Sequence, residues 1–145
     1  MNVESIMTTR VVGVRMDDTL RTVKHLFEHH PFHHLVVFEH GKAVGVLSDR
    51  DLLRNISPFI GKLAERSMDE ATLNKRVHQI MTRRIIAVRR STPITDAARM
   101  LIDHRISCLP VLDDDGRCEG IVTWFDLMKW MINRECGAGG SARAA

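Results

Sequence analysis

Two spacings of apolar positions alternate along the first half of the chain. Short runs in which most positions are apolar predict buried strands at 11–14, 35–38 and 43–47. Over 20–27, between the first two runs, apolar residues recur every three or four positions, which is the spacing of an amphipathic helix. The pattern therefore predicts a strand, a helix and two further strands.

The residues between these runs are typical of element ends. Asp17 and Asp18 can cap the start of the helix, and Pro31 marks its end. The segment 39–42 fits a hairpin connection between the second and third strands. Ser48 is placed to open a second helix directly after the third strand.

The second half of the chain repeats this order of elements. Short apolar runs predict strands at 85–88, 109–112 and 118–122, and helical spacing predicts a helix whose apolar face lies over 94–101. Pro93 suits the first turn of that helix, since a proline there loses no hydrogen bond.

The two halves align with each other as a tandem duplication. Residues 3–40 match 77–114 without a gap, and residues 41–54 match 116–129 after one added residue. Because each half alone is too short to bury a sufficient core, we expect the repeats to pack together with pseudo-twofold symmetry and a cleft between them. The sequence thus predicts an α+β fold of two β-α-β-β-α repeats, divided into repeat 1 (1–60), a helical connector (61–76), repeat 2 (77–134) and a disordered tail (135–145).

One short motif occurs twice, each time where a strand is expected to run into a helix. Gly45–Asp51 and Gly120–Asp126 both match Gly-x-x-[Ser/Thr]-x-x-Asp. One interpretation is a capping box, in which the hydroxyl accepts from a backbone N–H and the acid accepts from the N-cap N–H. The other is a nucleotide site, because a helix start attracts phosphate and an Asp can accept hydrogen bonds from ribose hydroxyls. The repetition favours the nucleotide site.

Composition excludes several classes of protein. The 145 residues are 44% hydrophobic and 27% charged, as in ordinary globular domains, and the longest apolar runs are far too short to span a bilayer. The net charge of +3 comes from interspersed charges, so nucleic acid is not an expected partner. Cys108, Cys118 and Cys136 lack metal-site spacing, and the N-terminus lacks a secretory pattern, so we expect reduced thiols in a cytoplasmic protein.

Taken together, these segments resemble a tandem pair of cystathionine β-synthase (CBS) domains, a Bateman module, over residues 3–133. The resemblance rests on the Ile-Met-Thr openings of both halves, on His34–Val37 and Cys108–Val111, and on both Gly-x-x-[Ser/Thr]-x-x-Asp motifs. It implies a regulatory, non-catalytic module that binds AMP, ADP, ATP or S-adenosylmethionine between the repeats, with no obligatory cofactor. It also implies a homodimer formed through helices and an effector protein that the sequence does not identify.

The resemblance assigns ligand contacts position by position. Ser48 and Thr123 match the hydroxyl that contacts phosphate or ribose, and Asp51 and Asp126 match the ribose-binding acid. The positions that enclose the base, through backbone groups and apolar side chains, are Val11, Val12, His34, Leu35, Val36, Ile85, Ile86, Cys108, Leu109 and Pro110.

The two copies of the motif differ at one chemically important position. Arg50 offers a guanidinium to a phosphate, whereas Phe125 takes the equivalent place in the second copy. We therefore expect unequal sites, with the first copy favouring a phosphorylated ligand. The competing interpretation of Arg50 is a solvated surface charge.

A histidine-rich segment, 25–34, raises the alternative of a metal-responsive module. His25 and His29 are four positions apart and can share a helical face, but Pro31 interrupts the helix and no acidic or cysteine partner stands out. We expect these histidines to lie on the surface without a metal, with His34 as a candidate for ligand contact.

Large apolar side chains gather near the end of the second repeat, at Trp124, Phe125, Trp130 and Met131. Their spacing fits core packing, and some of them can instead form a dimer interface. A purely structural dimerisation module, with both motifs acting only as caps, is therefore part of the same alternative as the metal-responsive module. A small hydrolase is a more distant alternative, since the sequence contains no P-loop, Gly-x-Ser-x-Gly or His-Glu-x-x-His motif.

Overall fold

The computed structural model describes residues 1–139, and it confirms the expected α+β fold. Within these residues, no helix is long and apolar enough to cross a lipid bilayer. The elements in chain order are the 3-10 helix η1 (Val3–Ser5), β1 (Gly13–Arg15), α1 (Leu20–His29), β2 (His34–Glu39), β3 (Lys42–Ser48), α2 (Asp49–Asn55), α3 (Ser67–Ala71), the 3-10 helix η2 (Thr72–Asn74), α4 (Val77–Ile80), α5 (Ile94–His104), β4 (Cys108–Leu112), β5 (Cys118–Thr123) and α6 (Trp124–Gly139).

These elements form two compact units, each with its own hydrophobic core. The central unit comprises residues 12–85. The terminal unit comprises residues 1–11 together with the chain from residue 86 onward. The units therefore differ from the sequence repeats, because the segment that leads into each repeat belongs to the unit built by the other repeat.

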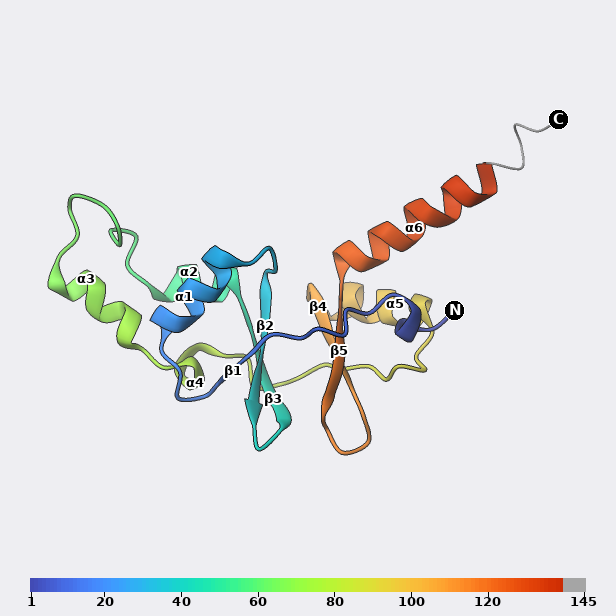
Figure 1. The fold of residues 1–145 in the computed structure, drawn as a ribbon, viewed down its shortest axis with the longest axis horizontal. Coiled ribbons are helices and arrows are strands. Elements are labelled where there is room, and N and C mark those ends of the chain that lie inside the picture. The colour runs from blue at the N-terminus through green and yellow to red at the C-terminus, as the bar shows by residue number, and fades with distance from the viewer. Residues whose placement is uncertain (140–145) are drawn as a thin grey trace. The chain divides into compact units, whose positions relative to one another are not determined.

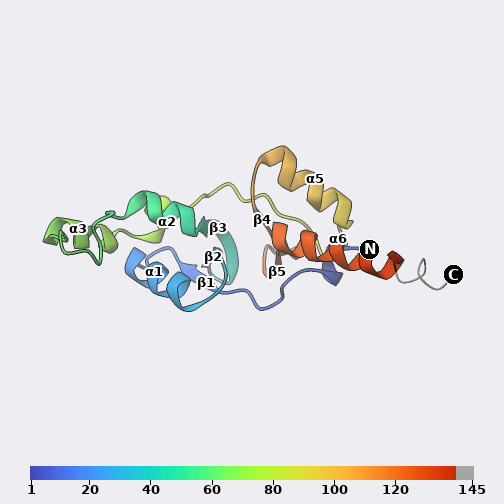
Figure 2. The same cartoon turned by 90° about the horizontal axis from the view of Figure 1, so that it is seen from above.

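The central unit is built on a three-stranded sheet. β1 pairs in parallel with β2, and β2 pairs antiparallel with β3. The β2–β3 hairpin turns at His40 and Gly41, whose φ angles of 51° and 77° are those of a tight turn that favours glycine. Helices α1 and α2 lie on the same side of this sheet (Figures 1 and 2). The core between them contains Val14, Leu20, Val23, Leu35, Val37, Leu47, Leu52, Val77 and Met81.

The terminal unit is built on the antiparallel hairpin of β4 and β5. Helix α5 packs against this hairpin, and α6 begins directly where β5 ends (Figure 1). α6 has 16 residues, whereas the equivalent α2 has 7. The core contains Val3, Val88, Ile94, Ala97, Leu101, Leu109, Val111, Val122 and Leu127.

The two Ile-Met-Thr segments explain how each unit is completed. Thr8 exchanges two backbone hydrogen bonds with Ile121 of β5, both of 2.9 Å. In the same way, Thr82 exchanges bonds of 2.9 and 3.0 Å with Val46 of β3. Each segment thus adds a bridge to the hairpin of the unit to which it belongs.

Two predicted element boundaries change in the structure. The strand predicted at 85–88 is reduced to one parallel bridge between Val88 and Val111, because only Val88 forms ladder hydrogen bonds there. Helix α1 takes Thr19 as its N-cap instead of an aspartate. The carboxylate of Asp18 accepts from the N–H of Arg15 at 2.8 Å and so stabilises the preceding turn.

The connector and the tail also differ from the predicted pattern. The connector becomes helical only from Ser67, where Asp69 accepts from the N-cap N–H of Arg66 at 2.9 Å. α6 continues to Gly139, into the segment predicted to be a disordered tail, because each glycine in a helix costs only about 1 kcal/mol. Residues 140–145 of that tail lie outside the described residues.

Candidate functional site

The first Gly-x-x-[Ser/Thr]-x-x-Asp motif forms a complete capping box at the start of α2. The Ser48 Oγ accepts from the Asp51 N–H at 3.1 Å, and the Asp51 Oδ2 accepts from the Ser48 N–H at 2.9 Å. The Ser48 hydroxyl also lies 2.9 Å from the same carboxylate oxygen, to which it donates. Both side chains are half-buried at the junction of β3 and α2.

The second motif repeats the aspartate contacts of this box in the terminal unit. The Asp126 Oδ2 accepts from the Thr123 N–H at 2.9 Å and from the Thr123 hydroxyl at 3.2 Å. The capping interpretation is therefore correct for the first motif, and in the second the aspartate accepts from the Thr123 N–H as that interpretation predicts. It does not compete with ligand binding, because the cap uses Oδ2 of each aspartate and holds the carboxylate in one orientation at the helix start.

His34 lies beside the first motif. It pairs with Ser48 in the β2–β3 register, and burial is the main cause that lowers its pKa below the ordinary value, partly offset by Asp49. The neighbouring His33 places its Nδ1 2.8 Å from the Asp49 Oδ2. The sequence pattern missed this contact, since the two residues are 16 positions apart. They meet because the start of β2 pairs with the end of β3, where α2 begins.

Arg50 lies in the first turn of α2 with its side chain exposed. Its charge is close enough to influence the His34 pKa, as are those of Asp49 and Asp51. The structure thus brings Ser48, Arg50, Asp51 and His34 together within the central unit.

The predicted base-enclosing positions of the central unit fall into two groups. Leu35 is fully buried and faces the core, so a ligand can reach only its backbone. Val36 alternates with it and points to the opposite face of the sheet, the face that His34 also occupies, where Val36 is fully buried as well. Val12 packs on the margin of the core, and Ile85 is half-buried.

The terminal unit repeats this division. Leu109 is fully buried in the core, and Cys108 and Pro110, which alternate with it and point to the other face of β4, are also buried. Cys108 is the register partner of Thr123, which places it beside the second motif as His34 is beside the first. Val11 is half-buried, as is Ile86, which packs against the core.

The glycine of each motif lets an Ile-Met-Thr segment approach the strand closely. A Cβ on Gly45 would lie 3.0 Å from both the Met81 Sδ and the Thr82 carbonyl oxygen. A Cβ on Gly120 would lie 2.9 Å from the Met7 Sδ. The Ile-Met-Thr segments therefore require these glycines, a role that could have been inferred from the co-occurrence of both signals in each repeat.

The histidine-rich segment lies on the surface of the central unit. The rings of His25 and His29 stack with centroids 4.0 Å apart, and the Nδ1 of His29 lies 2.8 Å from the His25 carbonyl oxygen. Within residues 1–139, no three His, Cys, Asp or Glu side chains gather in an arrangement that could hold a metal ion.

Among the cysteines, burial raises the pKa of Cys118, and Cys136 is exposed on α6.

Comparison with known sequences gives a consistent family match. The model of the family described as CBS domain matches residues 3–58 and 77–133. A CBS domain-containing protein of Dictyostelium discoideum is 30% identical over 132 residues, which cover 90% of this chain and 90% of that protein. An uncharacterised protein of Methanocaldococcus jannaschii is 30% identical over 155 residues, covering 91% of this chain and 92% of that protein.

Solved structures agree with this match. The crystal structure of CBSX2 in complex with AMP has a TM-score of 0.76 at 29% identity, covering 92% of this chain and 98% of that chain. A CBS domain pair in complex with 5′-methylthioadenosine and S-adenosyl-L-methionine has a TM-score of 0.75 at 25% identity, covering 90% of this chain and 99% of that chain.

Proposed function

The chain belongs to the CBS domain family, and from this premise we propose that it is a regulatory module that binds an adenosine-containing ligand and carries out no catalysis itself. The observation that carries the proposal is the duplicated motif. In both units a strand ends at a hydroxyl residue, and an aspartate held by the helix cap follows three positions later. Relatives of similar length and fold bind AMP or S-adenosyl-L-methionine, which supports the same class of ligand for this chain.

The chemistry of each junction suits a nucleoside. A capped carboxylate can accept hydrogen bonds from ribose hydroxyls, and the first N–H groups of a helix attract phosphate. We assign the ribose to Asp51 and Asp126 and the adjacent phosphate or ribose contact to Ser48 and Thr123. We assign the contacts to the base to the sheet face that carries His34 and Val36, with its counterparts Cys108 and Pro110, through backbone groups where the side chain is fully buried, as it is at Val36.

The proposed regulation requires that the ligand bind one conformation of the module more tightly than another. We propose that a homodimer of this chain in the cytoplasm passes that change to an effector protein. The exposed apolar side chains of α6 support the dimer, since they have no partner within the unit's core.

Calorimetric titration with AMP, ADP, ATP and S-adenosylmethionine tests the proposed function. We expect at least one ligand to bind the wild-type protein and to bind Asp51→Asn or Asp126→Asn about tenfold or more weakly, because hydrogen bonds to a charged group are among the strong ones. An asparagine can still accept the N-cap hydrogen bond, so the start of each helix is retained.

Asp103→Asn is the matched control, since Asp103 is exposed on α5 and belongs to neither motif. Circular dichroism verifies that all three variants fold. If none of the four ligands binds the wild-type protein at protein concentrations that reveal micromolar affinity, both motifs act only as caps and the proposed function is wrong.

A further inference from the structure

Two histidines of α1 form a closely packed pair on the surface of the central unit. His25 and His29 are exposed, and their rings stack with centroids 4.0 Å apart and planes inclined by 30°. Their side chains project from the same side of the helix, because residues four positions apart lie one above the other. The pair uses no residue that we assign to the adenosine ligand.

A hydrogen bond determines which nitrogen of His29 can bind a metal ion. Its Nδ1 lies 2.8 Å from the His25 carbonyl oxygen. A carbonyl oxygen only accepts, so Nδ1 carries the proton and the lone pair of the neutral ring is on Nε2. Most metal-binding histidines have this arrangement, with the second ring N–H donated to a carbonyl or a carboxylate. Spacing along the sequence does not reveal this bond.

The distance between the two rings suits one shared ion. Two nitrogens that bind the same ion at about 2.1 Å lie roughly 3–3.5 Å apart. Rings with centroids 4.0 Å apart reach this separation through small rotations about their side-chain bonds. Water completes the coordination of an ion held by two imidazoles, so the site does not require a third protein ligand.

The next histidine along the chain is held in a different position. The ring of His30 stacks on Phe32 with centroids 5.0 Å apart, and its Nδ1 lies 3.0 Å from the Leu26 carbonyl oxygen. His30 is exposed, as both members of the pair are. It is therefore a matched control for His25 and His29.

The charged side chains beside the pair do not repel a cation. Lys24 pairs with Glu28, and Arg21 pairs with Glu70 at 3.5 Å, so both positive charges of this part of α1 are balanced. The hydrogen bond from Lys24 is the main cause that lowers the pKa of Glu28, and both histidines of the pair add to the effect. The Glu28 carboxylate is thus close to both rings and can accept a hydrogen bond from a metal-bound water.

We propose that His25 and His29 form a binding site for a late first-row transition-metal ion, of the class of Ni²⁺, Cu²⁺ and Zn²⁺. Neutral imidazole nitrogens prefer these ions, whereas Mg²⁺ and Ca²⁺ prefer oxygen ligands. An ion that links two successive turns of α1 stabilises this helix and with it the folded central unit.

Calorimetric titration of the untagged protein with NiCl₂ tests the site. We expect saturable binding of Ni²⁺ and none of Mg²⁺ at the same concentrations. His25→Gln and His29→Gln should each weaken Ni²⁺ binding about tenfold or more, because the second imidazole of a chelate acts at a high effective concentration. His30→Gln should leave it unchanged. Equal affinities for Ni²⁺ and Mg²⁺ would indicate oxygen ligands and would contradict the proposal.

A thiol is the competing ligand for such an ion. Cys136 is exposed on α6, in the other unit. Cys136→Ser should therefore bind Ni²⁺ as tightly as the wild-type protein does. A loss of binding in this variant, with His25→Gln unaffected, would assign the ion to the thiolate and overturn the histidine site.

Urea unfolding with and without NiCl₂ gives a second measurement. An ion that binds the folded pair more tightly than the unfolded chain raises the urea midpoint. We expect this rise in the wild-type protein and in His30→Gln, and its loss in His25→Gln and His29→Gln. Circular dichroism verifies that the variants fold without the ion. A rise in His29→Gln as large as in the wild-type protein would contradict the role of the pair.

The outcomes also separate this site from the proposed function. Ni²⁺ binding that is lost in His25→Gln and retained in Asp51→Asn supports the metal site, whether or not an adenosine ligand binds. If an adenosine ligand binds through Asp51 or Asp126 while Ni²⁺ does not bind, the metal site is wrong and the proposed function stands. Equal losses in His25→Gln and His30→Gln would show that Ni²⁺ binds the surface histidines singly and would overturn the paired site.

Discussion

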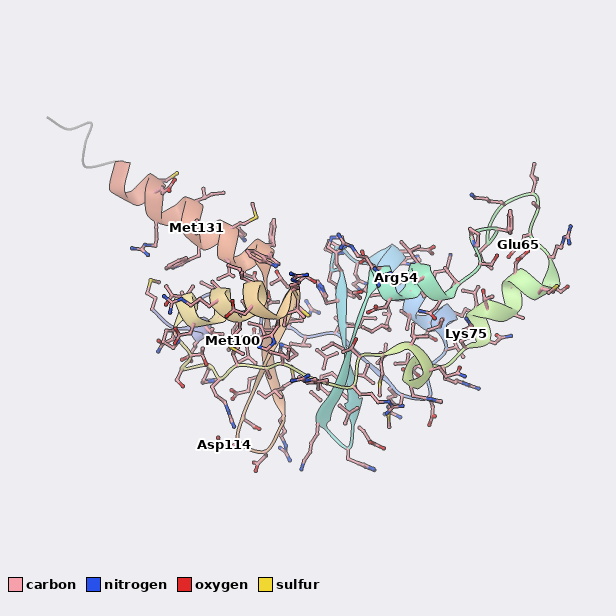
Figure 3. All side chains as sticks on the ribbon, turned by 180° about the vertical axis from the view of Figure 1, so that it is seen from behind. Arg54, Glu65, Lys75, Met100, Asp114 and Met131 are labelled. Atoms are coloured by element: carbon pink, nitrogen blue, oxygen red, sulfur yellow. The ribbon has the colours of Figure 1, made fainter. Side chains whose placement is uncertain are left out.

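Arg50 is the side chain that most clearly separates the two copies of the motif. It is exposed in the first turn of α2, where a helix start already attracts anions, whereas the equivalent Phe125 is an exposed ring. We expect Arg50→Ala to weaken the binding of ATP to the central unit by about three- to tenfold and to leave S-adenosylmethionine unchanged or slightly improved. Calorimetry with both ligands tests this, with Arg54→Ala, one turn further along α2 (Figure 3), as the control. Equal losses for both ligands would show that Arg50 does not recognise phosphate.

His34 should make the stability of the protein depend on pH. Because burial lowers its pKa in the folded protein, the unfolded chain binds a proton more readily as the pH falls below the ordinary value of 6.5. The free energy of unfolding should therefore decrease from pH 7.5 towards pH 5, until the pH is below the pKa of the folded state. Asp49 opposes this effect, while Arg50 and His33 act in the same direction as burial.

Urea unfolding across this pH range tests the assignment. His34→Gln should flatten the decrease in stability, because glutamine does not titrate. His29→Gln, at an exposed position of α1, should retain the slope of the wild-type protein. The same slope in His34→Gln as in wild type would show that other histidines dominate.

Whole elements were predictable where their pattern is local. The apolar runs at 35–38 and 43–47 and the helical spacing at 20–27 all correspond to observed elements, and Ser48 and Asp51 form the predicted cap. The segment 85–88 was wrong as a strand, because an apolar run does not reveal how many of its N–H groups will find a partner. The strands with which the Ile-Met-Thr segments pair were also not predictable, since the paired residues lie 36 or more positions away in the sequence.

Gly120→Ala should show how much the contact between the first Ile-Met-Thr segment and β5 contributes to stability. The new Cβ would lie 2.9 Å from the Met7 Sδ and 3.0 Å from the Thr8 carbonyl oxygen, so either the segment or β5 must move. We expect a loss of about 1–3 kcal/mol in the free energy of unfolding, measured in urea. Gly137→Ala is the matched control, because nothing lies within 4 Å of a Cβ there and alanine favours the helix. An unchanged free energy of unfolding in Gly120→Ala would mean that the first Ile-Met-Thr segment is readily displaced from β5.

For the molecule as a whole, the sequence predicted the duplication but not how the chain is divided between two cores. The division follows from contacts between residues 1–11 and the second repeat, which no local pattern encodes. The same contacts place η1 beside the first turns of α6. The motif residues assigned to ligand binding are therefore readable from the sequence, whereas the position of η1 beside α6 became known only from the structure.

Self-association is the prediction that belongs to the complete chain. Phe125, Met128 and Ile132 form a stripe along α6 with exposed fractions of 68%, 57% and 58%, and Met131 adds to it (Figure 3). Apolar side chains arranged in this way on a helix are typical of a surface that a second copy covers. Sedimentation of the wild-type protein should give twice the mass of one chain, and Met128→Glu should shift it towards the monomer, because a buried unpaired charge is unfavourable. Ile102→Glu, at a comparably exposed position of α5, should remain dimeric. If the wild-type protein is a monomer, or if both variants dissociate equally, the stripe on α6 is not the dimer interface.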